Sequence, residues 1–280
     1  MTPNNGIGVK RLAEVLLIRE ASHGRTYLVA MKFIHHTLHG PHNCYFDETE
    51  KDDIFGVAGW VGTFENWMAL EDRWRKALPA EAKGDFHYTD FWNDPKHYAA
   101  KWTQEKRLEH ITTLATIAHD CTAFGVGFVF SKTSYDELIP PKNKKALISP
   151  LHFCLAQCIV GILDFYKTIP SPPPPPLRFM FDRKEGQKES LGDVYYNVRK
   201  LFDKDHILGN ISIGDRKHEC PLQAADLLIG ELRRRRIGHE SKIMDILCRK
   251  RPLIVAFPTD QEFRAHLKNV LVELKNKSKA

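Results

Sequence analysis

Apolar residues recur along the chain with two different periods, which predicts a fold built from both strands and helices. Short apolar runs bounded by polar segments are typical of strands, and apolar residues three or four positions apart are typical of helices. The expected strands cover residues 44–46, 54–61, 123–130, 177–181 and 211–213. The expected helices cover residues 64–78, 103–120, 149–166, 188–204, 221–236, 242–247 and 261–274. This interleaving predicts the α/β class.

The segments between these elements refine the prediction. The charged turn Lys51-Asp52-Asp53 between the first two strands indicates an antiparallel hairpin. Residues 85–88 are expected to form a short strand or a loop. Prolines 172–176 exclude a helix or a central strand, and a stiff connector is favoured over a docking segment for an SH3-like partner. Pro221 suits the first turn of a helix.

The chain divides into a body and two ends. Residues 1–42 are interpreted as an N-terminal extension, residues 43–236 as the folded domain, and residues 237–280 as a basic, helical C-terminal segment. The extension ends in four closely spaced histidines, His35, His36, His39 and His42. Histidine ligands must converge on one ion, and the Gly40-Pro41 break interrupts any helix that could hold them, so a surface loop is favoured over a metal site.

Charge is concentrated near the C-terminus. The 280 residues carry a net charge of +6, and residues 231–280 contain 13 Lys and Arg against 6 Asp and Glu. With 42% apolar residues the chain has enough material for a sizeable core, which excludes a disordered or collagen-like protein. Clustered positive charge favours a polyanionic partner such as nucleic acid.

The cysteines and the apolar stretches bear on the compartment. Six cysteines form no Cys-x-x-Cys pair, and nothing at the N-terminus resembles a secretory signal, so reduced thiols in the cytoplasm are expected. Cys154 and Cys158 are interpreted as small core residues rather than metal ligands. The apolar stretch 153–166 contains Gln157 and Asp164 and is shorter than the roughly 18 residues of a membrane span, so no membrane partner is expected.

Three carboxylates share one kind of setting, next to a short apolar strand or inside a buried helix. Asp47 follows Cys44-Tyr45-Phe46, Asp182 follows Phe179-Met180-Phe181, and Asp226 lies in Gln223-Ala224-Ala225-Asp226-Leu227-Leu228. A buried Asp without a partner carries a desolvation cost of several kcal/mol. A divalent cation, an arginine, a capping amide or exposure of that helix face could each offset this cost at Asp226.

A common site for the three carboxylates would suit a hard metal ion. If the strands that end near Asp47 and Asp182 are neighbours, their carboxylates converge. Clustered carboxylate oxygens suit Mg²⁺ or Mn²⁺. Two such ions about 4 Å apart can activate water and stabilise the leaving oxygen of a phosphodiester. Without the ions, Asp47 and Asp182 would act as turn or loop caps.

The same segments resemble the three motifs of the domain-of-unknown-function family 3800. The similarity rests on Tyr45-Phe46-Asp47-Glu48-Thr49, Phe181-Asp182 and Leu222-Gln223-Ala224-Ala225-Asp226-Leu227-Leu228, and it spans about residues 43–236. The resemblance implies a ribonuclease H-like mixed sheet flanked by helices and metal-dependent nuclease chemistry. It assigns the metal-binding acidic positions to Asp47, Asp182 and Asp226, with Glu48 as a fourth catalytic candidate. The family typically has Asp-Glu-Ser-Gly in its first motif, whereas this chain has Asp47-Glu48-Thr49-Glu50.

Further residues are candidates for substrate binding. Arg233 and Arg234 lie seven and eight positions after Asp226 and so return to its helix face about two turns away, where they could hold a phosphate. A solvated charge run at the end of a helix is an equally good interpretation. His87 is a candidate base or ligand, although a structural histidine is favoured. Asp215 is a secondary carboxylate candidate.

These observations lead to one leading hypothesis and two alternatives. The leading hypothesis is a cytoplasmic phosphodiesterase or nuclease, a hydrolase that uses the Asp cluster to bind Mg²⁺ or Mn²⁺. The first alternative is a non-catalytic module that binds nucleic acid or another partner through the same fold. The second is a phosphoesterase that acts on a nucleotide or a small molecule. The sequence leaves the choice of DNA or RNA and the oligomeric state open.

Overall fold

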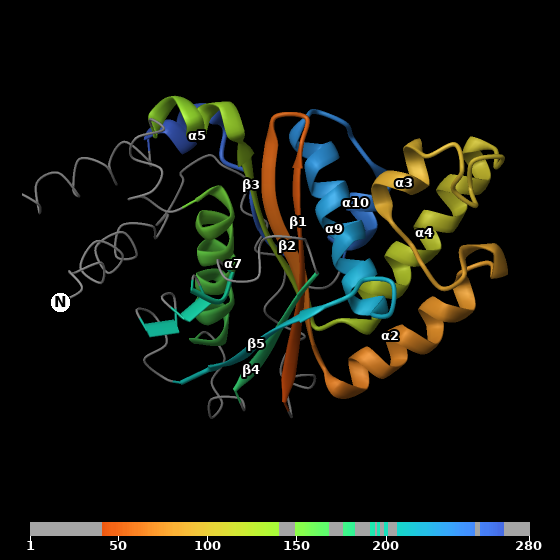
Figure 1. Ribbon diagram of the computed structural model, residues 1–280, viewed down its shortest axis with the longest axis horizontal. Coiled ribbons are helices and arrows are strands. Elements are labelled where there is room, and N and C mark those ends of the chain that lie inside the picture. The colour runs from red at the N-terminus through yellow and green to blue at the C-terminus, as the bar shows by residue number, and fades with distance from the viewer. Residues whose placement is uncertain are drawn as a thin grey trace, which may run out of the picture.

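A six-stranded mixed sheet forms the centre of the molecule (Figure 1). The strand order is β5-β4-β1-β2-β3-β6. The strands are β1 (His42–Lys51), β2 (Ile54–Thr63), β3 (Phe124–Ser131), β4 (Leu177–Asp182), β5 (Leu208–Gly214) and β6 (Leu253–Ala256). β1, β2 and β3 are antiparallel neighbours, whereas β4 is parallel to β1, β5 to β4, and β6 to β3. The predicted α/β class is therefore confirmed.

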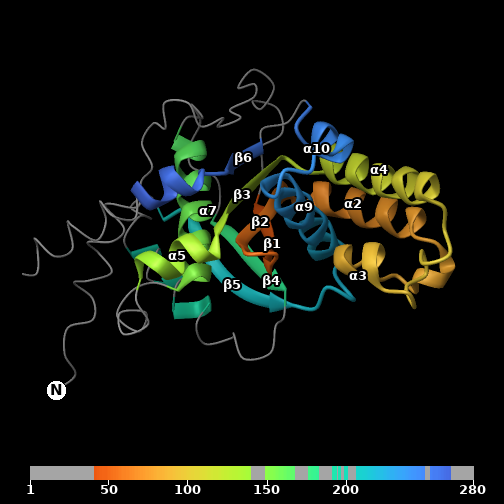
Figure 2. The ribbon, with the colours of Figure 1, turned by 90° about the horizontal axis from the view of Figure 1, so that it is seen from above.

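The computed structural model describes residues 41–139, 149–167, 176–182, 191–193, 195–196, 199–200, 206–249 and 253–265. Helices cover both faces of the sheet (Figures 1 and 2). One face carries α2 (Phe64–Ala77), α3 (Tyr88–Asn93), α4 (Gln104–Cys121), α9 (Cys220–Arg236) and α10 (Lys242–Leu247), and the other carries α7 (Pro150–Lys167). The short η2 (Ala80–Ala82) follows α2, and α5 (Lys132–Leu138) follows β3. Within these ranges, none of the helices is long and apolar enough to cross a membrane.

Side chains of β2 alternate between two hydrophobic cores, one under each helical layer. Ala58 and Trp60 pack on the α9 side, whereas Val57 and Val61 pack on the α7 side. All ten residues of β2 are buried, as expected for a central strand covered on both faces. This alternation decides which side of the sheet each polar residue of the neighbouring β1 can reach.

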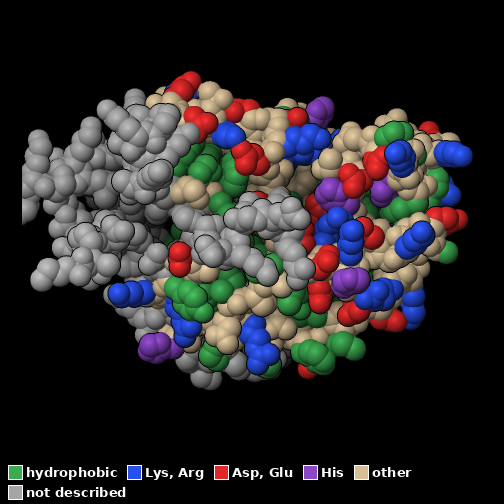
Figure 3. All heavy atoms as spheres, viewed as in Figure 1, with side chains coloured by type: hydrophobic (Ala, Val, Ile, Leu, Met, Phe, Trp, Pro, Cys, Tyr) green, Lys and Arg blue, Asp and Glu red, His purple; other side chains and the backbone are tan. Residues whose placement is uncertain are grey.

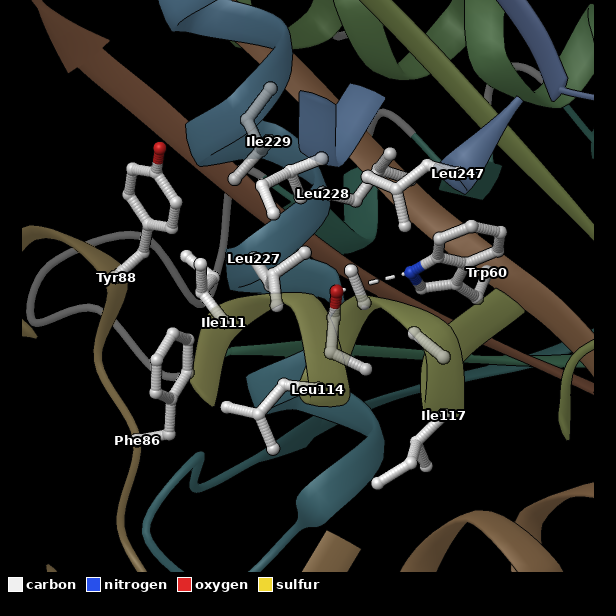
Figure 4. Packing of buried hydrophobic residues seen from close by; sticks show 14 of the residues in the cluster. Trp60, Phe86, Tyr88, Ile111, Leu114, Ile117, Leu227, Leu228, Ile229 and Leu247 are labelled. Atoms are coloured by element: carbon white, nitrogen blue, oxygen red, sulfur yellow. Dashed lines mark hydrogen bonds between the residues drawn. The ribbon is translucent and has the colours of Figure 1, made fainter. Parts of the chain in front are cut away.

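Helix α9 packs directly over the sheet on the side that carries most of the helices. Pro221 lies in its first turn, as predicted, and residues 220–233 are all buried. The indole Nε1 of Trp60 donates a 3.0 Å hydrogen bond to the Ala224 carbonyl oxygen, which the dashed line in Figure 4 marks. Leu227, Leu228 and Ile229 extend the same core (Figure 4). The packing constrains the buried side chains of residues 220–233.

Gln223 explains part of the Gln-Ala-Ala-Asp segment in structural terms. Its amide Oε1 accepts a 2.8 Å hydrogen bond from Trp74 Nε1 on α2. Its Nε2 donates to the carbonyl oxygens of Gly84 and Arg216, at 2.8 and 3.0 Å. One buried side chain thus ties α9 to α2 and to two loops.

The predicted hairpin of β1 and β2 turns through two residues, Asp52 and Asp53. Both have positive φ, 55° and 60°, which Asp tolerates in such turns. The Asp53 carboxylate accepts hydrogen bonds from the Ser131 hydroxyl and from the backbone N–H and hydroxyl of Thr133. The turn is therefore locked to the end of β3 and the start of α5.

The structure differs from the sequence prediction in several elements. Residues 85–87 form a loop, one of the two expected alternatives, but α3 begins at Tyr88. α5 and β6 were not predicted, and β1 continues to Lys51 instead of ending before Asp47. Residues 1–40, prolines 172–175, most of 183–205 and residues 266–280 lie outside the described residues, and so do His35, His36 and His39.

Candidate functional site

The register of two parallel strands brings the first two carboxylates together. Phe46 of β1 pairs with Phe181 of β4, so Asp47 and Asp182 follow side by side. Both phenylalanines point into the core on the α7 side, and their rings stack with centroids 5.2 Å apart. Because side chains alternate along a strand, both carboxylates point to the opposite side, towards α9. The condition set for convergence of the two carboxylates, that their strands are neighbours, is therefore met.

Asp226 reaches the same place from the helix above. Asp47 pairs across the hairpin with Ala58, which belongs to the core under α9. Asp47 and Asp226 each retain only 6% of their exposure. The three acidic residues line one pocket of about 210 Å³. Other residues that line it include Glu48, His87, Thr89, Arg216, Gly230 and Arg233.

The pocket strongly affects the ionisation of Asp226. Burial raises the pKa of Asp226 to about 6, and the charge of Asp182 adds to the rise. The Tyr88 backbone N–H, which donates a 2.7 Å hydrogen bond to Asp226 Oδ2, opposes it, as do Arg216 and a hydrogen bond with the side chain of Asp47. Burial is the largest of these causes, so Asp226 binds a proton more readily than an isolated Asp does.

Asp182 is held by the residue that follows the next strand. Its Oδ1 accepts a 3.0 Å hydrogen bond from the backbone N–H of Arg216, and its Oδ2 lies 4.0 Å from Arg216 Nε. Arg216 Nη1 donates to Asp85 Oδ1 at 2.9 Å and to the Phe86 carbonyl oxygen at 2.6 Å. An arginine guanidinium is therefore part of the acidic pocket.

Tyr88 fixes the position of Asp226 through contacts with Asp226 itself and with the next turn of α9. Besides the backbone hydrogen bond to Asp226, its hydroxyl donates to Glu231 Oε1 at 2.6 Å. Its ring lies against Gly230, where an added Cβ would come within 2.3 Å of a ring atom. Glu231 is fully buried, and its Oε2 has no hydrogen-bond partner among the described residues. Tyr88 and Gly230 thus allow α3 to approach α9 closely enough for the Asp226 hydrogen bond.

The donor set fits a hard divalent cation. No three His, Cys, Asp or Glu side chains of the described residues already surround a point where an ion could bind. Asp182 Oδ1 is engaged by the Arg216 backbone N–H. A divalent cation would offset the cost of burying the charged forms of Asp47 and Asp226, and carboxylate oxygens are ligands that suit it. Asp47 and Asp226 would hold such an ion, with Asp182 as the third ligand.

Glu48 lies on the other face of β1 from Asp47, as the strand geometry predicts. It pairs with Val57, which belongs to the core on the α7 side. Burial raises the pKa of the Cys154 thiol on α7, and the Glu48 charge adds to that rise. The Glu48 backbone N–H donates a 2.7 Å hydrogen bond to Asp47 Oδ1. Glu48 thus borders the pocket and supports Asp47 through its backbone.

The structure separates the two arginines that the helix period placed together. Arg233 lines the pocket with 6% exposure, and its Nη1 lies 3.7 Å from Asp52 Oδ2. Arg234 contacts the Tyr88 hydroxyl at 3.4 Å and lies over the Trp92 ring, 5.2 Å from its centroid. Only Arg233 faces the carboxylates, because a single helical step of 100° turns Arg234 towards α3.

His87 and Asp215 have different surroundings. His87 lines the pocket just before α3, and its Nδ1 lies 2.6 Å from Asp90 Oδ2 without hydrogen-bond geometry. Asp215 accepts a hydrogen bond from the Lys217 backbone N–H and is absent from the pocket lining. Figure 3 shows basic, acidic and histidine side chains interspersed over the right-hand part of the molecule, where α2, α3 and α4 lie in the same view of Figure 1.

Arg216 and Tyr88 are the important residues that the sequence did not reveal. Arg216 follows a predicted strand, as Asp182 does. This position could have marked Arg216 as a candidate site residue. Tyr88 gave no signal, because its partners lie about 140 positions away in the chain. Comparison of the chain with family models, curated proteins and solved structures finds no match.

Proposed function

We propose that this protein is a metal-dependent phosphodiesterase of the nuclease class, with a ribonuclease H-like fold and kinship to family 3800. The observation that carries the proposal is the meeting of Asp47, Asp182 and Asp226 from three separate elements in one buried pocket. The mixed sheet, with helices on both faces, supports the proposed fold. The raised pKa of Asp226 supports a cation site, because perturbed carboxylates cluster at functional sites.

Each pocket residue has a role that its position supports. Asp47, Asp182 and Asp226 would hold Mg²⁺ or Mn²⁺, which supplies charge neutralisation and an activated water when bound. Arg233, at the other end of the pocket lining, would bind a phosphate of the substrate. His87, whose Nδ1 faces Asp90, lines the same pocket and is placed to contact the substrate. Tyr88 and the Glu48 backbone hold the carboxylates in place.

The size of the pocket favours a polymeric substrate over a small molecule. Pockets that enclose drug-sized ligands measure about 300 to 1,000 Å³. The pocket here measures about 210 Å³, enough for a phosphate group and an ion but small for a whole nucleotide. A phosphodiester that passes over the pocket therefore fits better than an enclosed nucleotide.

Arg216 favours one alternative, a binding module without hydrolysis. Its guanidinium already places a positive charge beside Asp182 and opposes the rise in the pKa of Asp226. A site neutralised in this way could bind a partner through Arg233 without any metal. The two functions differ in one measurable property, the dependence on a divalent cation.

The test is cleavage of labelled DNA and RNA with Mn²⁺, with Mg²⁺ and with EDTA. We expect cleavage that requires the cation and is lost in Asp226→Asn. Asp215→Asn is the matched control, because Asp215 is a nearby carboxylate outside the pocket lining. Equal cleavage by Asp226→Asn and wild type would contradict the proposal. Salt-sensitive binding without cleavage would establish the binding module instead.

A further inference from the structure

Arg216 is held in a fixed position at the carboxylate pocket. Its side chain is only 15% exposed, and it lies in the loop between β5 and α9. Asp85 and the Phe86 carbonyl oxygen hold Nη1 from one side, and Asp182 holds the backbone N–H from the other. A guanidinium fixed in this way loses little conformational entropy when it binds an anion.

Part of the guanidinium is still available to a ligand. Nη1 is used twice, and Nε lies 4.0 Å from Asp182, beyond hydrogen-bond distance. Within the described part of the chain, Nη2 donates no hydrogen bond, although Arg216 lines the pocket. The guanidinium can therefore offer the Nε and Nη2 edge, the pair of donors that suits two oxygens of one phosphate.

Arg216 and Arg233 lie at opposite ends of the region around Asp226. Arg216 precedes α9, whereas Arg233 lies seven residues after Asp226, about 10 Å along the helix. Both line the same pocket. A chain of phosphates that crosses the carboxylates would therefore meet an arginine side chain on each side of them. A single arginine with a structural role would not give this arrangement.

We propose that Arg216 is a substrate-binding residue that contacts an anionic oxygen of a phosphate ester at the carboxylate pocket. The inference rests on the proposed function, since it assumes that the carboxylates hold a divalent cation. It assigns the phosphate nearest the carboxylates to Arg216 and a neighbouring phosphate to Arg233. Arg216 thus competes with the metal for the carboxylates but cooperates with it in holding the phosphate.

This dual position predicts opposite effects on two ligands. Removing a positive charge close to Asp182 and Asp226 should strengthen metal binding, on the order of tenfold for charges a few ångströms apart in a partly screened site. Removing a charged donor should weaken phosphate binding, also on the order of tenfold. A residue that only supported the fold would weaken both ligands together.

The experiment is isothermal titration calorimetry with Mn²⁺ alone, and then with inorganic phosphate in the presence of Mn²⁺. For Arg216→Gln we expect tighter Mn²⁺ binding and weaker phosphate binding. For Arg216→Lys, which keeps the charge but loses the planar fork, we expect wild-type Mn²⁺ affinity and intermediate phosphate affinity. Arg73→Gln is the control, because Arg73 forms an ion pair with Asp120 and is absent from the pocket lining.

The outcomes separate this inference from the proposed function. Unchanged phosphate affinity in Arg216→Gln, or equal weakening of both ligands, overturns the role of Arg216. Mn²⁺ binding by the wild-type chain without phosphate binding also overturns it and leaves the metal site standing. Absence of Mn²⁺ binding by the wild-type chain overturns the proposed function itself. If Arg216→Gln does not fold, a phosphate affinity in Arg216→Lys equal to wild type overturns the inference.

Discussion

Replacing Asp226 by Asn should stabilise the metal-free protein while abolishing its response to metal. The folded protein raises the pKa of Asp226 from 3.8 to about 6, mainly by burial. Above pH 6 the group is therefore ionised at a cost to the folded state. At about 1.4 kcal/mol per pKa unit, the difference amounts to at most about 3 kcal/mol. Asn keeps an oxygen for the Tyr88 N–H and adds an amide donor for Asp47.

The sign of the pH dependence follows from the two pKa values. Between pH 3.8 and about 6, folded Asp226 binds a proton that the unfolded chain releases. Stability of the wild type therefore rises as the pH falls through this window, and the advantage of Asp226→Asn disappears near pH 4.

The assay is urea unfolding of both proteins in EDTA, at pH 7.5, 6, 5 and 4. We expect Asp226→Asn to be more stable by about 1 to 3 kcal/mol at pH 7.5 and to converge with the wild type at pH 4. Millimolar Mn²⁺ should then stabilise the wild type and leave the variant unchanged. A variant that is less stable at pH 7.5, or a gap that does not depend on pH, would refute the reasoning.

Three further predictions concern the support of the site and the pH range of the fold. Gly230→Ala should destabilise the folded protein by about 1–3 kcal/mol, since the added Cβ would collide with Tyr88. The control is Gly192→Ala, because Gly192 is a helical glycine with open space around it. In urea unfolding this control should be neutral or stabilising. Gln223→Leu should lower the free energy of unfolding by about 3 kcal/mol, because the three hydrogen bonds of this buried side chain disappear. A wild-type urea midpoint would contradict this. Burial lowers the pKa of His42 from 6.5 to about 4, and the Glu65 charge opposes this shift. Between these pH values the unfolded chain binds a proton at His42 that the folded protein does not. Stability should therefore fall by up to about 3 kcal/mol as the pH drops from about 6.5 to 4. His42→Phe should flatten this slope in acid titrations followed by circular dichroism, and an unchanged slope would show that other groups cause it.

Local patterns in the sequence were sufficient for the elements that carry the carboxylates. The apolar runs that end in Phe46 and Phe181 located the two strands, although the predicted strands stopped just before Asp47 and Asp182. Pro221 and the apolar run after it defined the start of α9. These signals act within a few residues, so they can be read without the fold.

Other features depend on contacts that local patterns do not contain. The role of Arg216 depends on Asp85 and Phe86, more than 120 positions away. β6 has only four residues, and its pairing with β3 gives it its identity as a strand. The contacts of Arg234 with Tyr88 and Trp92 depend on where α3 packs.

The parallel pairing of β1 with β4 also has a consequence for the order of folding. β1 meets β2 after a two-residue turn, but Phe46 meets Phe181 only after 135 further residues have been synthesised. Until then β1 is an open edge, and open edges invite pairing with other chains. The charged run Asp47-Glu48-Thr49-Glu50-Lys51 lies on this edge and opposes such pairing through repulsion and hydration. We therefore expect Asp47, the acidic residue proposed for chemistry in the finished protein, also to limit aggregation of the nascent chain.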